Sequence, residues 1–330
     1  MKALVTGGTG FIGKYLVKEL LSQGMNARLL VRSKSSNLKF DSSKNIELWP
    51  GDLTYPETLS GISEGMDYVF HLAAEGHVSA LSSSAYQKFF KVNVEGTRNL
   101  ILECGKHPSK IKKFIHFSST AAMGLIKKKI VDESDIPQPV TPYQKSKLES
   151  ERIAMELGKQ LGIPVVILRP CMVYGVNGKG EFYRICQWMR KGIFPRVGFG
   201  KNLTPLVHVK DVVQAAIQAS RKGRPGEIYL ITSERSIGLD ELRLLVMKAW
   251  EKKAPYPYVP VWFMYLLAYG FEMISKMTGN PPIFTRHNIA STVWDREFSI
   301  EKAKKDLGYS PRISFEEGIS ETVNWFKTLI

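Results

Sequence analysis

Short hydrophobic runs alternate along the chain with stretches in which hydrophobic residues recur every three or four positions. The runs predict buried strands, and the helical spacing is clearest over 93–104 and 146–158. The expected strands are Lys2–Val5, Ala27–Val31, Ile46–Leu48, Tyr68–Leu72, Lys113–Phe117, Pro164–Leu168 and Glu227–Ile231. Strands that alternate with helices predict an α/β fold, in which helices cover both faces of a parallel sheet.

The regular alternation weakens from about residue 170, where loops are expected at 173–180 and 198–205. We therefore predict a main domain, formed by 1–169 and about 207–231, and a smaller C-terminal lobe, formed by about 170–206 and 232–330. Ligands of open α/β sheets bind beyond the carboxyl ends of the strands. The smaller lobe is expected to cover that edge and to bind the substrate.

The segment 258–271 is unusually rich in hydrophobic and aromatic residues, but Pro260 and Gly270 interrupt it. It is too short for a confident membrane span of about 20 residues. Three interpretations stay open: a buried helix, a wall beside an apolar substrate, or a surface that contacts a membrane peripherally.

The composition is that of a soluble globular protein, with 44% hydrophobic and 23% charged residues in 330. The net charge of +15 is scattered, and no nucleic-acid recognition motif accompanies it, so we expect no nucleic-acid partner. The three cysteines have neither metal nor disulfide spacing, which predicts reduced thiols and no metal site. We expect a cytoplasmic protein, or one peripheral to a membrane.

A glycine-rich turn, Thr6–Gly13, lies between the first strand and the first helix. Gly7 permits a tight turn, Gly10 lets the backbone approach a pyrophosphate, and Gly13 lets the helix pack on the strand. The helix N-terminus offers unpaired N–H groups to the phosphates. The pattern predicts that the main domain is a dinucleotide-binding domain of the Rossmann type.

Tyr143 and Lys147 are four residues apart and would share one face of a helix. An ammonium group beside a phenol favours the phenolate, so we expect Lys147 to lower the pKa of Tyr143. Ser119 follows an expected strand and offers a hydroxyl that could hold a substrate oxygen. The three side chains together predict a catalytic set for the interconversion of an alcohol and a ketone.

Together these pieces resemble the extended short-chain dehydrogenase/reductase family, of the NAD-dependent epimerase/dehydratase kind, over nearly the whole chain. The matching segments are Thr6–Gly13, Gly51–Leu53, His71–Ala74, Asn93–Thr97, Ser118-Ser119, Tyr143 with Lys147, Leu168–Pro170 and Val207–Val212. One departure is Met123, at a position where the family often has tyrosine.

The resemblance implies a nicotinamide cofactor, with Tyr143 as the acid/base, Lys147 also on the nicotinamide ribose and Asp52 near the adenine. It also implies a homodimer. The cofactor-binding residues are expected to be Gly7, Gly10, Phe11, Ile12, Gly13, Arg32, Ser33, Lys34, Asp52, Leu53, Leu72, Ala73, Ala74, Asn93, Tyr143, Lys147 and Pro170.

The end of the second strand bears on the choice of nicotinamide cofactor. A carboxylate there would favour NAD, but the chain has Arg32, Ser33 and Lys34, which suit a 2′-phosphate. We expect NADP, with NAD as the alternative if Arg32 only stacks on the adenine.

The sequence constrains the identity of the substrate less than that of the cofactor. The C-terminal segment resembles the 3β-hydroxysteroid dehydrogenase and dihydroflavonol reductase branches, which implies an apolar steroid-, flavonoid- or lipid-like substrate. The alternative is a nucleotide-sugar 4-epimerase or dehydratase with tightly bound NAD, in which Arg184, Arg190 or Arg286 would hold a diphosphate.

Overall fold

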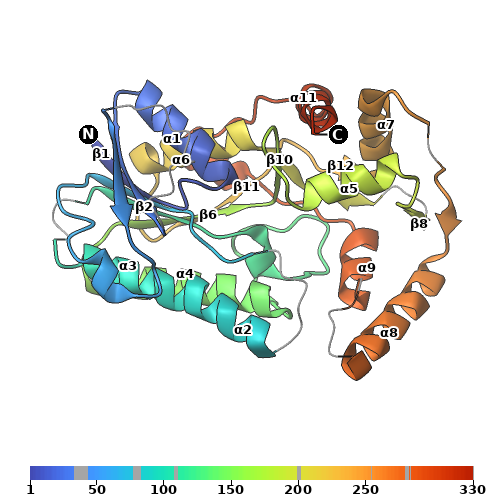
Figure 1. Ribbon diagram of the computed structural model, residues 1–330, viewed down its shortest axis with the longest axis horizontal. Helices are drawn as coiled ribbons and strands as arrows, with labels where there is room; N and C mark the ends of the chain where they lie inside the picture. Colours follow the sequence, from blue (N-terminus) through green and yellow to red (C-terminus); the bar gives the residue numbers. More distant parts are fainter. Residues whose placement is uncertain are drawn as a thin grey trace.

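A seven-stranded parallel sheet forms the centre of the computed structural model (Figure 1), which describes residues 1–32, 44–76, 83–107, 111–198, 202–253, 255–278, 282 and 284–329. Its strands are β1 (Lys2–Thr6), β2 (Asn26–Val31), β3 (Ile46–Pro50), β4 (Tyr68–His71), β5 (Lys113–Phe117), β6 (Val165–Pro170) and β11 (Ile228–Ile231). All seven strands that the hydrophobic pattern predicts are therefore present.

The strand order across the sheet is β11-β6-β5-β4-β1-β2-β3. Strand β1 pairs in parallel with both β2 and β4, so the chain reverses its direction of winding beside β1. This reversal is the place where a doubly wound sheet binds a nucleotide beyond its carboxyl edge. The predicted Rossmann-type fold is confirmed.

Helices cover both faces of the sheet. On one face lie α1 (Phe11–Ser22), α6 (Val209–Lys222) and α10 (Glu301–Leu307), whose buried side chains join one core cluster. On the other face lie α3 (Gly96–Cys104) and α4 (Pro142–Gln160), in a second cluster. Figure 1 shows the sheet between these two layers.

The residues at the start of α4 are typical of a helix N-terminus. Thr141 caps it, and Gln144 accepts hydrogen bonds from the backbone N–H groups of Val140 and Thr141. Pro142, at the first position of the helix, already has the backbone geometry that a helix needs. This start fixes the orientation of Tyr143 and Lys147, which follow in the first two turns.

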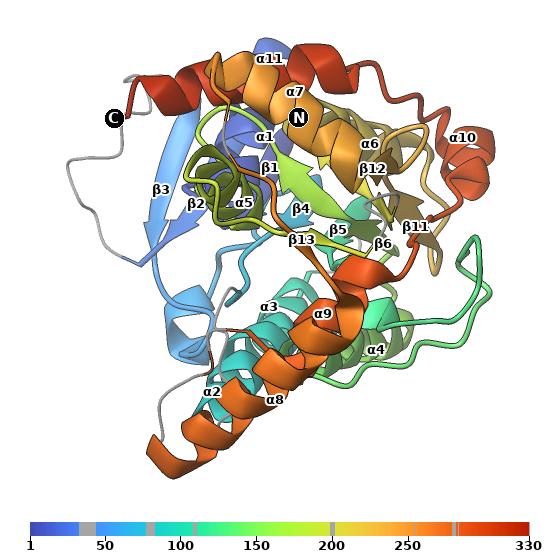
Figure 2. The same ribbon diagram turned by 90° about the vertical axis from the view of Figure 1, so that its right-hand side faces the viewer.

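Most of the remaining helices and strands lie at the right-hand end of Figure 1, which is the end that faces the viewer in Figure 2. Three of them, α5, α7 and α11, share a third core cluster. The remaining elements are α2 (Ser83–Phe89), β7 (Met172–Tyr174), α5 (Glu181–Arg190), β8 (Arg196–Val197), β9 (Leu203–Thr204), β10 (Leu206–His208), β12 (Ile237–Gly238), α7 (Leu239–Trp250), β13 (Tyr258–Val259), α8 (Val261–Thr278), α9 (Arg286–Val293) and α11 (Phe315–Lys327).

The C-terminal part of the chain packs against two different parts of the fold. Ala303 and Leu307 of α10 pack into the core cluster of the central sheet, whereas Ile319 and Val323 of α11 pack with α5 and α7. The division into a dinucleotide-binding domain and a substrate-binding lobe stays a prediction. Within the described residues, no helix is both long and hydrophobic enough to cross a membrane.

Candidate active site

Ser119 lies just beyond the carboxyl end of β5, where a short 3₁₀-helix, Thr120–Met123, begins. Its hydroxyl accepts a hydrogen bond of 3.1 Å from the backbone N–H of Ala121. The Ser119 side chain also lies close enough to the phenol of Tyr143 to lower its pKa by hydrogen bonding. The structure thus brings together two side chains that are far apart in the sequence.

Tyr143 lies on the first turn of α4 and remains partly exposed. The ring of Phe89 packs edge-on against its ring, with centroids 5.7 Å apart, and a Cβ at Gly76 would lie 3.8 Å from it. Burial raises the pKa of Tyr143 to about 12, and the carboxylate of Glu181 adds to this, whereas the hydrogen bond with Ser119 lowers the pKa. The net direction is opposite to the one expected from the sequence.

Lys147 explains the difference. Its side chain is 3% exposed, and Nζ donates a hydrogen bond of 2.7 Å to the carbonyl oxygen of Phe117. Burial lowers the pKa of this ammonium group to about 8, and the carboxylate of Glu151 acts in the opposite direction. The lysine is held by backbone at the end of β5 rather than by the phenol, so the desolvation of Tyr143 dominates.

Asn93 lies in a π-helical turn, Phe90–Glu95, which joins α2 to α3. Such turns widen a helix locally and are frequent at functional sites. The Asn93 amide donates to the hydroxyl of Ser146 at 3.0 Å and exchanges hydrogen bonds with the backbone of Glu75. It therefore ties the segment after β4 to α4, next to Tyr143.

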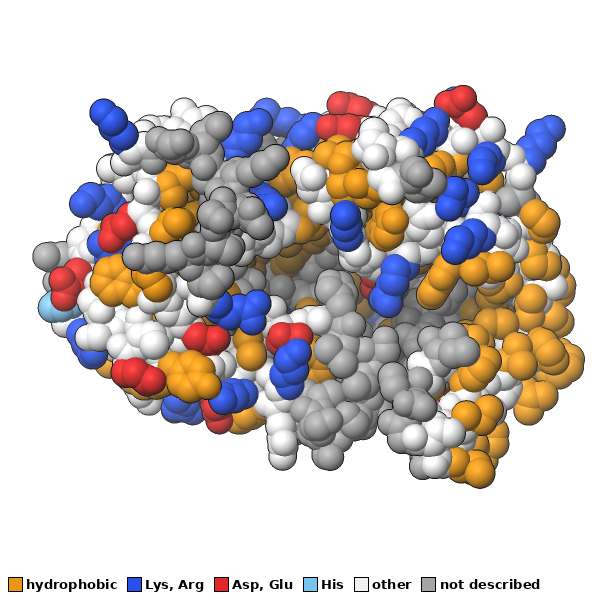
Figure 3. Space-filling view, in the orientation of Figure 1, with side chains coloured by type: hydrophobic (Ala, Val, Ile, Leu, Met, Phe, Trp, Pro, Cys, Tyr) orange, Lys and Arg blue, Asp and Glu red, His pale blue; other side chains and the backbone are white. Residues whose placement is uncertain are grey.

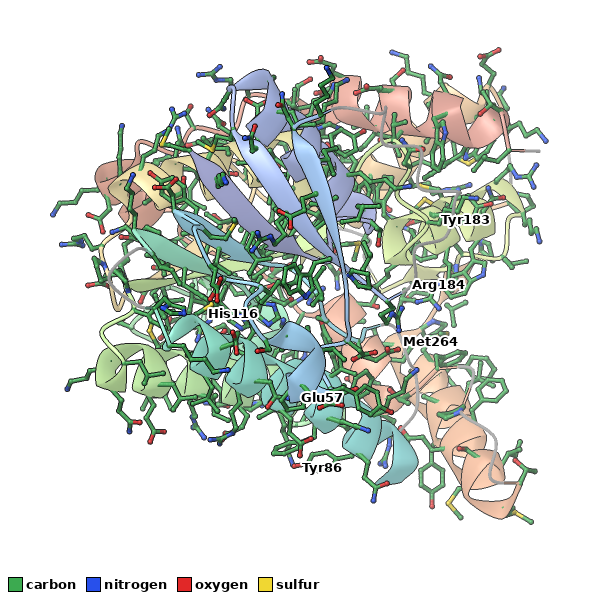
Figure 4. All side chains as sticks on the ribbon, turned by 60° about the vertical axis from the view of Figure 1, so that its left-hand side comes forward. Glu57, Tyr86, His116, Tyr183, Arg184 and Met264 are labelled. Atoms are coloured by element: carbon green, nitrogen blue, oxygen red, sulfur yellow. The ribbon has the colours of Figure 1, made fainter. Side chains whose placement is uncertain are left out.

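Two histidines that the sequence analysis did not select lie in the buried layer around Lys147. His71 contacts the hydroxyls of Thr6 and Thr97 at 2.7 and 2.8 Å. His116, which Figure 4 labels in the interior, contacts the hydroxyl of Ser150 at 3.1 Å. Burial, and then the charge of Lys147, lower the pKa of His71 to about 3 and the pKa of His116 well below its usual value. Both rings are therefore neutral at neutral pH.

The glycine-rich turn forms a tight cradle beside β4. Gly7 has a φ of +71°, and a Cβ there would lie 2.7 Å from the backbone nitrogen of Ala73. A Cβ at Gly13 would overlap the carbonyl oxygen of Gly7 and lie 2.7 Å from the Cα of Gly8. Gly10 caps α1 without a side chain, which leaves the first N–H groups of the helix open to an anion. The cradle fits a dinucleotide pyrophosphate.

Replacing Gly13 by alanine is expected to displace α1 from β1. The added methyl group meets backbone atoms, which cannot move aside as a flexible side chain can. We expect a loss of stability of about 1–3 kcal/mol, typical of overpacking, together with weaker binding of NAD and NADP. Urea unfolding and nucleotide titration measure the two effects. Gly270→Ala in α8 is the control, because open space surrounds Gly270, and it should gain about 0.5–1 kcal/mol.

The other expected cofactor residues lie along the carboxyl edge of the sheet. Phe11 and Ile12 begin α1, Leu72–Ala74 follow β4, and Pro170 ends β6. Asp52 and Leu53 follow β3, where the Asp52 carboxylate accepts hydrogen bonds from Thr54. Arg32 is exposed at the end of β2, whereas Ser33 and Lys34 lie outside the described residues. The roles of these residues stay predictions.

The sequence analysis did not identify Glu181, a charged residue near Tyr143, or Arg296, a charged residue near Glu181. Glu181 begins α5 and raises the pKa of Tyr143. Burial lowers the pKa of Arg296, while Glu181 raises it, so the two charges are close to each other. The Arg296 Nε atom has no hydrogen-bond partner among the described residues. No local motif marks these two residues, because they come from segments that only the tertiary fold brings together.

The chain is similar to known proteins over its whole length. It is 26% identical to the 4-hydroxy-2-methyl-3-oxo-4-farnesyl-3,4-dihydroquinoline-1-oxide ketoreductase of Stigmatella aurantiaca, over 97% of this chain and 95% of the relative. It is 29% identical to a putative dihydroflavonol 4-reductase of Synechocystis, over 98% and 94%. The crystal structure of UDP-glucose 4-epimerase from Thermotoga maritima, with UDP-glucose, is 27% identical, with a TM-score of 0.79 over 100% of both chains.

The family model of the NAD dependent epimerase/dehydratase family matches residues 3–232. This range contains the glycine cradle, Ser119, Tyr143 and Lys147. The family resemblance drawn from the sequence is thus confirmed, and the three proteins named above carry the names of enzymes. The chain belongs to the NAD dependent epimerase/dehydratase family, and it is an enzyme of the extended short-chain dehydrogenase/reductase type.

Proposed function

We propose that this enzyme interconverts a secondary alcohol and a ketone on an apolar substrate. The observation that carries the proposal is the proximity of the Ser119 hydroxyl to the phenol of Tyr143, with the buried ammonium of Lys147 one helical turn away. A hydroxyl that can hold the substrate oxygen thus lies beside a phenol that can exchange a proton with it. The neighbouring glycine cradle fits the cofactor on which such chemistry depends.

A bound nicotinamide cofactor would supply or accept the hydride at the carbon of the substrate. Tyr143 would give its proton to the carbonyl oxygen during reduction and take it back during oxidation, while Ser119 holds that oxygen. Because the pKa of Tyr143 is about 12, the phenol carries its proton at neutral pH and is ready to act as an acid.

Support for an apolar substrate comes from the relatives and from the composition of the C-terminal region. A relative is named as a ketoreductase of a farnesyl-bearing dihydroquinoline oxide, and another as a putative dihydroflavonol reductase. Both names describe reduction at a carbonyl of a molecule with large apolar parts. A panel of steroid ketones, dihydroflavonols and prenylated quinolones, each with NADPH and with NADH, tests the substrate class by product formation.

The second candidate function is a nucleotide-sugar 4-epimerase or dehydratase with tightly bound NAD, favoured by the structural similarity to a UDP-glucose epimerase. Of the three arginines expected to hold a diphosphate, Arg286 pairs with Glu272 at 2.8 Å. Arg190 lies over the ring of Trp250, at 5.2 Å from its centroid. Arg184 is exposed on α5 (Figure 4). Purified protein that retains NAD and converts UDP-glucose without net change in reduced nicotinamide would favour this candidate.

Replacing Arg32 by aspartate tests the preference for NADP. The substitution exchanges a cation for a carboxylate at the exposed end of β2, where it would repel the 2′-phosphate. We expect NADP binding to weaken on the order of tenfold or more, as for a lost hydrogen bond to a charged group, with little loss of NAD binding. Isothermal titration with each nucleotide measures the effect, and equal losses for both would contradict the proposal.

The homodimer that the family resemblance implies also remains a proposal. A molar mass measured by light scattering across a range of protein concentrations decides between a dimer and a monomer. The measurement needs no substrate and is independent of the proposed chemistry.

A further inference from the structure

The α8 helix presents a hydrophobic outer face. Its exposed side chains range from 38% to 84% exposed. We call these residues the α8 face: Trp262, Phe263, Leu266, Leu267, Tyr269, Met273, Ile274 and Met277. Figure 3 shows hydrophobic side chains gathered at this end of the molecule, where Figure 1 draws α8. Soluble monomers rarely expose contiguous apolar patches of more than a few hundred Å².

The opposite side of α8 is packed firmly onto the protein. Met264 and Ala268 are 8% and 0% exposed, and they share a core cluster with β8 and α9 (Figure 4 labels Met264). The rings of Phe271 and Phe284 meet edge-on, with centroids 5.0 Å apart. The α8 face is therefore a fixed surface of the folded protein, and the expectation that the segment forms a buried helix holds only for its inner side.

None of the eight side chains that form the α8 face is charged. The described charged side chain of α8 is Glu272, and it pairs with Arg286 of α9 at 2.8 Å. The Arg286 guanidinium also lies over the ring of Tyr269, at 5.3 Å from its centroid. The face is thus apolar along the helix, with an indole and a phenol among its members, and these are the rings that gather at membrane–water interfaces.

Exposed cationic side chains lie in segments that precede α8 in the chain. Lys252 and Lys253 are exposed just after α7, in the segment that leads to β13, and Lys191 is exposed on the turn after α5. These positions are neighbours in space, because a Cβ at Gly192 would lie 2.8 Å from Pro255. Figure 3 shows Lys and Arg side chains above the hydrophobic ones at this end. Cations beside an exposed apolar face are attracted to anionic lipid headgroups.

We propose that the α8 face docks the enzyme on the surface of an anionic lipid bilayer, with the helix lying in the interface. A helix of this length is about 27 Å long, so it can lie along the surface over several turns. The net charge of +15 favours an anionic surface and opposes a second copy of the same chain, which carries the same charge. The proposal does not depend on the reaction that the enzyme catalyses.

Sedimentation with lipid vesicles tests the proposal. The full chain is mixed with vesicles of phosphatidylcholine alone, and with vesicles that also contain phosphatidylglycerol. We expect binding to the anionic vesicles that weakens at high salt, and little binding to the neutral ones. Replacing both Trp262 and Leu266 by glutamate should weaken binding at least about tenfold, because the two residues lie one turn apart on the face.

The control variant carries Ile136→Glu and Leu244→Glu, at exposed hydrophobic positions in other parts of the fold. It changes the net charge by the same amount, so equal loss of binding in both variants would overturn the role of the α8 face. Absence of binding by the wild-type protein would overturn the proposal outright. A wild-type dimer that becomes monomeric in the Trp262 and Leu266 variant would assign the face to a second copy. Reduction of a water-soluble ketone, measured in parallel, tests the proposed function separately.

Discussion

Tyr143→Phe is expected to lower turnover by at least the ~10²-fold typical of a lost general acid, while leaving cofactor binding nearly intact. The substitution removes the hydroxyl that lies next to Ser119 and keeps the ring that packs against Phe89. The helix start at Thr141 and the glycine cradle are untouched, so the fold and the nucleotide site should persist. Steady-state kinetics and nucleotide titration measure the two quantities on the same preparation.

The matched control is Tyr86→Phe, at an exposed phenol on α2 whose ring stacks on Phe90 (Figure 4 labels Tyr86). It removes the same atom from the same residue type outside the proposed site, so turnover should stay within the error of the wild-type value. Normal turnover of Tyr143→Phe would remove Tyr143 from the mechanism. A parallel loss of nucleotide binding would instead show that the phenol holds the cofactor.

Glu151→Ala is expected to cost about 3–5 kcal/mol of stability, the largest effect on folding that the structure indicates. Glu151 and Arg169 form a buried ion pair, each side chain 3% exposed, with contacts of 2.9 and 2.5 Å. Removal of the carboxylate leaves in the interior a guanidinium that still contacts Met123 Sδ at 2.7 Å. Urea unfolding measures the loss as a lower midpoint with an unchanged slope.

The double variant Glu151→Leu with Arg169→Met is the control for this prediction. It removes both charges and fills their space with apolar groups, which is often neutral or stabilising. We expect it to recover most of the stability that Glu151→Ala loses. If the single variant were as stable as the wild type, the pair would not be buried as the structure shows. If the double variant lost as much as the single one, packing rather than charge would explain the loss.

The central parallel sheet could be predicted from the sequence because its strands carry a strong hydrophobic pattern. The positions of the glycine turn at Gly7–Gly13 and of Tyr143 and Lys147 on one helix were also predictable, since both are local patterns, whereas their catalytic roles stay predictions. The expectation that failed concerned the pKa of Tyr143, which depends on desolvation and on the position of the Lys147 ammonium. Neither quantity can be derived from the spacing of two residues along a helix.

Other parts of the candidate site could not be predicted, because tertiary packing creates them. Glu181 lies at the start of α5 and Arg296 lies after α9, and no local motif surrounds either residue. The π-helical turn that holds Asn93 is a local widening of a helix, which a hydrophobic period of three to four residues does not reveal. The exposure of the outer face of α8 could not be predicted either, since the sequence of this segment fits a buried helix equally well.

The most direct test of the central claim compares the amount of reduced nicotinamide that is oxidised with the amount of alcohol that is formed. Purified protein, NADPH and a panel of steroid ketones and dihydroflavonols are mixed, and the loss of reduced nicotinamide is compared with alcohol formed. The account predicts one NADPH oxidised for each alcohol made, and at least a ~10²-fold slower reaction for Tyr143→Phe. Conversion of UDP-glucose by protein that retains NAD, with no net oxidation of added NADPH by any ketone, would contradict it.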